Sequence, residues 1–202
     1  FADFSLLSFP ATGTWDRRDD PLDPTSVTYL LAEVTPFLGL DNTASGARAF
    51  GDARVYRGFG PENGVVFAGR LQIGSVAGAD LTEVHPDFLF YSGGGGTVRG
   101  QPYQSLDVDL GGGTRIGGRS FVGLSAEIRT SITDRIGAVA FVDAGYIGPE
   151  SFFDGSGDWH SGAGLGVRYQ TGLGPIRFDV AAPVGGSTGD GVQLYIGIGQ
   201  AF

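Results

Sequence analysis

An alternation of apolar and polar residues with a period of two constrains the fold more than any other feature, because it recurs along most of the 202 residues. Successive side chains in such a segment point to opposite faces, as they do in a β-strand. No segment shows a convincing helical period over three turns. The pattern predicts about nine strands, over Phe4–Asp16, Val27–Phe37, Ala47–Arg57, Gly64–Ser75, Ser120–Ser131, Ile136–Ile147, Trp159–Thr171, Ile176–Val184 and Val192–Phe202.

The two faces of these strands differ in a way that favours a membrane barrel. In Ser120–Ser131, Val122 and Leu124 share one face, whereas Glu127 and Arg129 share the other. The polar faces hold few charges, of both signs, and many glycines, which suits a crowded interior better than a solvated surface. The apolar faces are about as long as a bilayer crossing by a tilted strand. We therefore expect an all-β, antiparallel transmembrane β-barrel, with a soluble β-sandwich binding module as the alternative.

Composition narrows the possible classes and partners. No run reaches the roughly eighteen apolar residues that a spanning helix needs, so a helical membrane protein is excluded. The 13 basic residues are all arginine and face 22 acids, and the net charge of −9 argues against a nucleic-acid partner. The chain holds no cysteine, which is compatible with an oxidising periplasmic or outer-membrane location.

One long segment, 76–118, interrupts the alternation. A structureless loop of this length is uncommon in a compact domain and is usually functional. Within it, the glycine run Gly93–Gly96 allows positive φ angles and close packing, and Arg99 follows soon after. The run lacks the Gly-Lys-Ser/Thr sequence that completes a phosphate-binding loop. The role of the loop therefore depends on where Arg99 goes.

Five motifs, in order along the chain, resemble those of the outer-membrane assembly factors that carry POTRA repeats, the surface-antigen family. The resemblance is to the C-terminal barrel half of these proteins, and most of all to the TamA-like subunits of translocation and assembly modules. In Val98-Arg99-Gly100, the family's following aromatic is displaced to Tyr103 by two inserted residues. The motifs are the turn Asp19–Thr25, the loop motif Val98–Tyr103, the F-x-D-x-G strand Phe141–Gly145, the hairpin Gly174–Phe178 and the closing strand Ile198–Phe202.

This resemblance implies a sixteen-stranded barrel in the bacterial outer membrane, preceded by POTRA domains. Residues 1–202 would then be a single barrel domain formed by the last nine strands, with an inward-folding loop at 76–118. The start at Phe1, without an initiator Met or a signal peptide, suggests a processed or truncated chain. An odd strand count also suggests that the front half is absent, because single-chain bacterial barrels use even numbers. Open strand edges are not viable in lipid, so other strands would complete the barrel.

The resemblance further implies that the long loop folds into the barrel and that Arg99 pairs with Asp143 and with Glu127. The residues themselves agree with this, since both acids lie on the polar faces of neighbouring predicted strands. A guanidinium group can bridge two carboxylates through its fork of donors. The alternative is a solvated loop arginine near unrelated charges.

The last strand resembles the terminal β-signal by which outer-membrane proteins are recognised for insertion. An alternating strand can pair with an open sheet edge through main-chain hydrogen bonds, and its glycines weaken that pairing. In the family this strand forms a seam that opens for clients; alternatively, it is an ordinary closing strand anchored at the membrane interface by Phe202. The strand places Leu194, Ile196, Ile198 and Phe202 on one face and Tyr195, Gly197 and Gly199 on the other.

The function that follows is assembly rather than catalysis. His85 and His160 stand apart in the sequence and no cysteine exists, so neither a catalytic triad nor a metal site can be argued, and we expect no cofactor. The resemblance implies a factor that helps to insert or secrete β-barrel or autotransporter proteins through a weak seam. Its partners would be outer-membrane lipid, unfolded β-barrel clients and a periplasm-spanning assembly protein. A passive pore or a two-partner secretion transporter of the same fold is the alternative.

Overall fold

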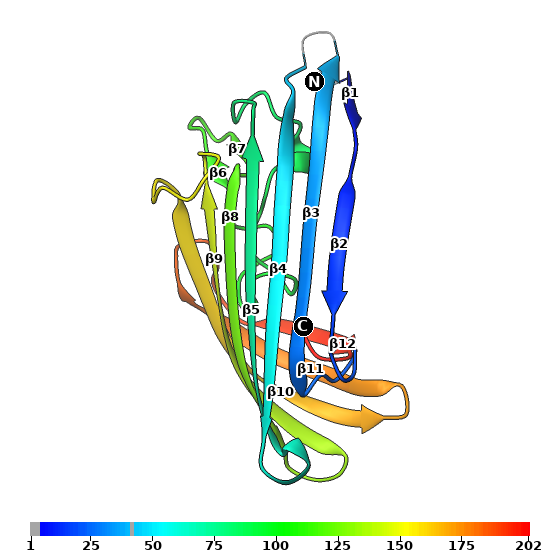
Figure 1. Cartoon of the computed structure of the whole chain (residues 1–202). Coiled ribbons are helices and arrows are strands. Elements are labelled where there is room, and N and C mark those ends of the chain that lie inside the picture. The colour runs from blue at the N-terminus through cyan, green and yellow to red at the C-terminus, as the bar shows by residue number, and fades with distance from the viewer. Residues whose placement is uncertain (1–4, 41–42) are drawn as a thin grey trace.

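One antiparallel sheet runs through most of the chain in the computed structural model, which describes residues 5–40 and 43–202. β1 and β2 both pair with β3, and the order then continues β4-β5-β8-β9-β10-β11-β12. The sheet curves strongly, so that β11 and β12 pass behind the lower part of β3 and β4 (Figure 1). Its strands are β1 (Ser5–Ser8), β2 (Ala11–Asp16), β3 (Ser26–Leu40), β4 (Gly46–Phe59), β5 (Val65–Ala77), β8 (Ser120–Ser131), β9 (Ile136–Gly148), β10 (Asp158–Thr171), β11 (Gly174–Gly185) and β12 (Gln193–Ile198).

The prediction of an all-β, antiparallel barrel wall is confirmed, and the alternative of a two-sheet sandwich is wrong. All nine predicted strand positions fall in the same sheet. The other sheet in the described residues is a small hairpin of β6 (Val108–Asp109) and β7 (Arg115–Ile116). Within the described part of the chain, β12 pairs with β11 alone, and β1 and β2 pair with β3 alone, so both edges of the sheet are open.

Proline divides the first predicted strand into two. β1 and β2 keep one register against β3, with Ser8 opposite Phe37 and Ala11 opposite Val34. Pro10 lies in the gap between them and has no N–H group to donate to the ladder. The prediction of one continuous strand is therefore wrong at this point. Phe4, which begins that predicted strand, lies outside the described residues.

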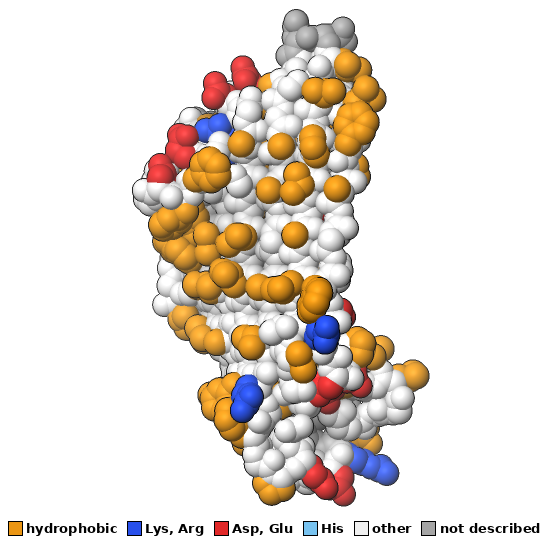
Figure 2. Space-filling model, viewed as in Figure 1, with side chains coloured by type: hydrophobic (Ala, Val, Ile, Leu, Met, Phe, Trp, Pro, Cys, Tyr) orange, Lys and Arg blue, Asp and Glu red, His pale blue; other side chains and the backbone are white. Residues whose placement is uncertain are grey.

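The outer face of the sheet is apolar and the inner face is charged. Rows of apolar side chains cover the outer face, and the charges on this view gather toward its two ends (Figure 2). Leu30, Val55 and Leu165 on this face are all exposed. This arrangement reverses that of a water-soluble sheet and fits a wall that faces lipid. The buried charged residues of the strands are Asp52, Glu127, Arg129, Asp143, Arg168 and Asp179.

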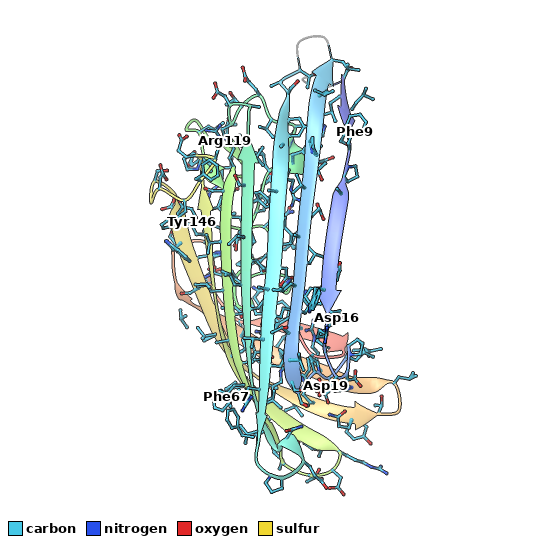
Figure 3. All side chains as sticks on the ribbon, in the orientation of Figure 1. Phe9, Asp16, Asp19, Phe67, Arg119 and Tyr146 are labelled. Carbon is cyan, nitrogen blue, oxygen red and sulfur yellow. The ribbon has the colours of Figure 1, made fainter. Side chains whose placement is uncertain are left out.

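The connections between strands differ at the two ends of the sheet. One end, the short-turn end, carries the connections 17–25, 60–64, 132–135 and 172–173. The other, the long-loop end, carries the inward loop 78–119, the outward loop 149–157 and the connection 186–192. Figure 3 places Asp19 at the short-turn end and Arg119 at the long-loop end. In outer-membrane barrels, the longer loops are extracellular and the short turns periplasmic.

The long loop contains more local structure than the sequence predicts. It begins after Ala77 and ends before Ser120, and it holds a 3-10 turn at Pro86–Phe88 as well as the β6–β7 hairpin. Its apolar residues Val84, Leu89, Phe90 and Leu106 form a buried cluster with Phe37, Val76, Phe121 and Ile147 of the strands. Among the described residues, no helix is long and apolar enough to cross a membrane.

Candidate functional site

Arg99 of the inward loop is buried against the inner face of β8 and β9, with 3% of its surface exposed. Its Nε and Nη2 donate to the two carboxylate oxygens of Asp143, at 2.7 and 2.9 Å. Its Nη1 donates to Glu127 at 2.5 Å, and its backbone N–H donates to Asp143 at 3.0 Å. The structure therefore brings together the three charged residues that the sequence singled out. The bidentate geometry is the strongest that arginine and a carboxylate can form.

Further charges extend this contact into a balanced network. Arg129 Nε donates to the second oxygen of Glu127 at 2.8 Å. Arg168 Nη1 donates to Asp179 at 2.5 Å, and Asp179 lies 3.8 Å from Arg99 Nη1. Each of the three arginines thus contacts at least one of the three acids. Mutual neutralisation of this kind is what makes buried charge tolerable in a low-dielectric interior. We call these residues the Arg99 cluster: Arg99, Arg129, Arg168, Glu127, Asp143 and Asp179.

An aromatic ring completes the setting of Arg99. The Cζ atom of Arg99 lies 3.6 Å from the centroid of the Phe141 ring, which is itself buried on β9. A guanidinium group at this position gains a cation–π contribution, which is larger when the pair is desolvated. Phe141 stands two residues before Asp143 on the same face, so the F-x-D part of the motif supplies both a ring and a carboxylate.

Glycines on the wall allow the loop backbone to come close. A Cβ atom on Gly162 of β10 would lie 1.9 Å from the carbonyl oxygen of Arg99. Gly100 has φ +92°, and a Cβ there would lie 2.5 Å from the carbonyl oxygen of Ala182. Within the run Gly93–Gly96, Gly93 and Gly94 take positive φ angles of 110° and 89°. Glycines therefore allow both the turn of the loop and its close approach to the wall.

A second contact, which the sequence did not reveal, joins the loop to β10 and to the connection 186–192. The Nε2 atom of His160 lies 2.8 Å from Ser92 Oγ, and its Nδ1 lies 2.8 Å from Thr188 Oγ1. Thr188 Oγ1 donates to Gln101 Oε1 at 3.0 Å, so it accepts from His160 Nδ1–H. Gln101 Nε2 in turn donates to the carbonyl oxygens of Ser161 and Gly185. Gln101 is one of the two inserted residues, so the insertion supplies an anchor.

Tyr103, the displaced aromatic of the loop motif, is 79% exposed. The aromatic contact to the motif comes instead from β12, because Gly100 N–H donates to the hydroxyl oxygen of Tyr195 at 3.0 Å. Val98, the first motif residue, is fully buried. Tyr195 thus links the inward loop directly to the edge strand.

The end of the chain departs from the predicted strand. β12 ends at Ile198, and Gly199 has φ +82°, a conformation that turns the chain away from the strand direction. Gln200 N–H then donates to the carbonyl oxygen of Leu22. The prediction that Gly199 and Phe202 continue the strand is therefore wrong, and so is the alternative in which Phe202 anchors the strand at the membrane interface.

Phe202 instead lies inside, with 6% of its surface exposed. Its ring centroid lies 6.4 Å from that of Tyr56 on β4, and its carbonyl oxygen accepts from Arg129 Nη2 at 3.0 Å. Arg129 also belongs to the Arg99 cluster, so the last residues and the inward loop meet in one network. The remaining residues of the strand keep the predicted alternation, and Leu194, Ile196 and Ile198 are 62%, 75% and 66% exposed on the outer face.

The match to known proteins decides the family. The model of the Omp85 superfamily domain matches residues 2–202, almost the whole chain. The chain belongs to the Omp85 superfamily. Its structure is similar to that of BamA from Haemophilus ducreyi lacking POTRA domains 1–3, with a TM-score of 0.70 and 19% sequence identity. The match covers 94% of this chain and 41% of that BamA chain, so this chain spans less than half the length of the protein it resembles.

Membership of the Omp85 superfamily implies a location in an outer membrane. The resemblance predicted from the motifs is confirmed at the level of this superfamily, and the similarity to BamA confirms the barrel fold. The finer assignment to the TamA-like subunits stays a prediction. Among residues 5–40 and 43–202, no group of three or more His, Asp or Glu side chains is arranged to hold a metal ion.

Proposed function

We propose that this Omp85 chain forms the part of an outer-membrane assembly factor at which client proteins are inserted or secreted, and that it acts without chemical catalysis. The observation that carries the proposal is the condition of β12. It is a short strand of six residues at the edge of the sheet, and it pairs with β11 alone in the described part of the chain. Its apolar residues face outward. Such an edge offers main-chain donors and acceptors to an incoming strand.

Two features make this edge weak as well as open. Gly197 provides no side chain to pack, and Gly199 ends the strand by turning the chain inward. A strand of this kind gives a client a pairing site that can be exchanged, rather than a permanently closed ladder. We propose that β12 templates the first strand of a client and later releases it. In the intact barrel the same edge would form the seam.

The Arg99 cluster supports this proposal by fixing the inward loop, which contacts the edge strand β12 through Tyr195. Tyr195 of β12 contacts Gly100, the residue after Arg99, so the position of the loop and that of the edge strand are linked. A buried ion pair is weak evidence for stability, because desolvation offsets much of its attraction. We propose that Arg99, Asp143 and Glu127 hold the inward loop in one position, and that Val98 and Gly100 shape its tip. Tyr103 has no assigned role in this proposal.

The proposed clients are unfolded β-barrel or autotransporter proteins, and a periplasm-spanning assembly protein is a proposed partner. A passive pore or a two-partner secretion transporter is the competing function. The inward loop, with its fully buried Val98 and buried Arg99, occupies the inner side of the wall and favours assembly over free conduction.

Site-specific crosslinking tests this proposal. The chain has no cysteine, so a single Ile196→Cys substitution on β12 of the intact protein can be crosslinked to a client that carries one cysteine in its terminal strand. Leu165→Cys on β10 is the matched control, because Leu165 is 68% exposed and Ile196 75%, but β10 pairs on both sides. We expect crosslinks during client insertion from Ile196 and none from Leu165. Equal yields, or ion conductance in liposomes without any client insertion, would instead support the pore.

A further inference from the structure

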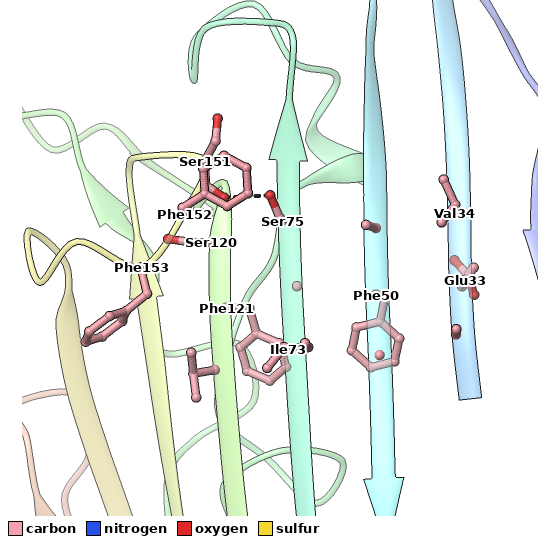
Figure 4. Close-up of a pocket in the computed structure, with 15 residues that line it drawn as sticks. Glu33, Val34, Phe50, Ile73, Ser75, Ser120, Phe121, Ser151, Phe152 and Phe153 are labelled. Carbon is pink, nitrogen blue, oxygen red and sulfur yellow. Dashed lines mark hydrogen bonds between the residues drawn. The ribbon is translucent and has the colours of Figure 1, made fainter. Parts of the chain in front are cut away.

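An apolar groove lies on the outer face of the sheet beside the outward loop, and the proposed function does not use it. The groove has a volume of about 450 Å³. It runs from β3 across β4, β5 and β8 to the outward loop, as Figure 4 shows. Its size falls within the range of about 300–1,000 Å³ that is usual for small-molecule sites.

The floor of the groove is made of small residues, and its flanks are larger. Ala32, Ala49 and Gly51 lie on the outer face of β3 and β4 and lower the surface there. Ile73 and Val122 border this hollow on β5 and β8. A Cβ on Gly51 would lie 3.3 Å from the side chain of Ile73, which is tighter than an ordinary contact, so glycine keeps the floor low beside Ile73.

The outward loop builds one wall of the groove, and polar contacts at its start hold it in place. Ser75 Oγ on β5 donates to the carbonyl oxygen of Ser151 at 2.6 Å. Arg119 donates to the carbonyl oxygen of Pro149 at 2.8 Å and to the carboxylate of Glu150 at 2.9 Å. These contacts bring the loop onto the outer face of the sheet, where Ser75 lies beside Ser151 (Figure 4). The wall is therefore fixed at its base.

Aromatic packing extends the wall. The ring of Phe153 lies 4.7 Å from that of Tyr146 and 6.3 Å from that of Trp159, centroid to centroid. This packing buries Tyr146 completely, although it belongs to the outer face of β9. Phe152 lines the groove and is 72% exposed. Covering this exposed ring with an apolar group would be favourable.

Two other hollows on the same face provide a comparison within the molecule. They have volumes of about 370 and 390 Å³ and are lined by strand residues alone. A molecule bound in either of them would contact strand residues on the sheet surface but no loop residue. The groove under the outward loop is distinguished by Phe152 and Phe153, which close one side of it.

We propose that this groove holds one acyl chain of a membrane lipid as a resident ligand, in the leaflet next to the long-loop end. The groove is continuous with the apolar outer face (Figure 2), and in a membrane barrel the apolar band of such a face contacts lipid. Its lining is almost entirely apolar, so it fits a hydrocarbon tail rather than a head group. The inference rests on the barrel fold and is independent of whether the chain inserts clients.

Photocrosslinking in nanodiscs tests it. The nanodiscs would contain phosphatidylcholine with a small fraction of phosphatidylcholine that carries a diazirine group on one acyl chain, and mass spectrometry would locate the labelled residues. We expect labelling of Ile73 and Phe152 to exceed that of Ile128 and Val142, which line a strand-only hollow. Equal labelling of both sites would show ordinary bulk lipid and would overturn the proposal.

Two variants and a control sharpen the test. Ala49→Leu fills the groove, and Phe152→Ala removes an exposed part of its wall, so each should reduce the excess labelling to the level of the strand-only hollow. Ala140→Leu, at an equally outward alanine in that hollow, should leave the excess unchanged. An excess that survives both variants contradicts the proposal. So does crosslinking of this face to a second copy of the chain, because the occupant would then be protein. Gel mobility before and after heating checks that each variant is folded.

Discussion

The two long loops at the same end of the sheet go to opposite faces, and their side chains explain the difference. The inward loop brings a buried arginine to carboxylates on the charged inner face. The outward loop brings Phe152 and Phe153 to the apolar outer face. Each loop thus matches the chemistry of the face that it covers. The comparison indicates that each loop is held by side chains that complement the part of the wall that it covers, and the inward loop adds an apolar cluster to its ion pairs.

Removal of the inward anchor has the largest expected effect. Arg99→Ala removes the guanidinium partner of the buried Asp143 and leaves Glu127 with Arg129 alone. Breaking a buried ion pair in this way costs about 3–5 kcal/mol. Heat-modifiable gel mobility and urea unfolding in detergent would measure the loss of stability. Protease cleavage within 92–101 should increase, whereas cleavage within 149–157 should not.

Arg99→Lys provides the matched control, because it keeps the charge but loses the fork that contacts both carboxylates. We expect an intermediate loss of stability. If Arg99→Ala left both folding and loop protection unchanged, the loop would not depend on this anchor, and the contrast between the two loops would fail.

A side chain added at the glycine of β10 that the inward loop approaches has the next largest expected effect. A Cβ on Gly162 would overlap the carbonyl oxygen of Arg99, so Gly162→Ala should push the inward loop off β10 at a cost of about 1–3 kcal/mol. Gly13→Ala is the control, because a Cβ on this β2 glycine meets nothing within 4 Å. Urea unfolding of the two variants would give the comparison. Equal stability of the two would show that the loop does not approach the wall as closely as described.

Removal of one aromatic side chain from the outward loop should have a smaller and more local effect on stability. Phe153→Ala removes ring contacts with Tyr146 and Trp159, worth about 1 kcal/mol for an aromatic pair. Lipid can replace part of this packing, because there is no hydrophobic driving force between apolar groups within a membrane. In a Trp15→Phe background, the emission of Trp159 should change, while protease protection of 92–101 stays the same. A loss of that protection would show that the two loops are coupled.

Asp19 lies at the short-turn end, opposite both long loops, and its substitution has the smallest expected effect on stability. Partial burial of Asp19 opposes its ionisation, but hydrogen bonds from Thr25 and Ser26 hold the pKa of Asp19 below its ordinary value of 3.8. A carboxyl group with a lowered pKa contributes stability above that ordinary value, and loses it as the pH falls through the lowered pKa. Asp19→Asn should flatten this acid dependence in unfolding measured below pH 5. An unchanged dependence would mean that other carboxyl groups cause it.

The sequence was sufficient to predict the wall, because alternation reports which face each strand residue occupies. The family resemblance pointed to Arg99, Asp143 and Glu127, and the printed residues agreed, since an arginine follows the glycine run and the two acids lie on the polar faces of neighbouring strands. The sequence did not reveal the hydrogen-bonded contacts of His160 with Ser92 and Thr188. These residues lie far apart in the chain, and none of them carries a pattern that distinguishes it from an ordinary polar residue.

Two further features could not be predicted from the sequence, for a different physical reason. The inward position of Phe202 depends on one backbone angle at Gly199, and an alternating pattern that includes glycine cannot reveal where the strand stops. The outward course of 149–157 is held in part by Ser75, a serine of β5 whose hydroxyl donates to the carbonyl oxygen of Ser151, and the sequence pattern does not reveal this contact. The inserted Gln101 gave a signal, in that it interrupts the loop motif, but its partners Ser161 and Gly185 could not be inferred from it.

Hydrogen exchange of the unmodified protein in nanodiscs tests the central claim most directly. Within 92–101, Ser92 N–H donates to Leu106, Gly94 N–H donates to Val98, and Arg99 N–H donates to Asp143 inside the barrel wall. We predict that peptides covering 92–101 exchange as slowly as the strands, and that peptides covering 149–157 exchange much faster. Fast exchange of 92–101, at the rate of 149–157, would contradict the account, because the inward loop would then not be held on the inner wall.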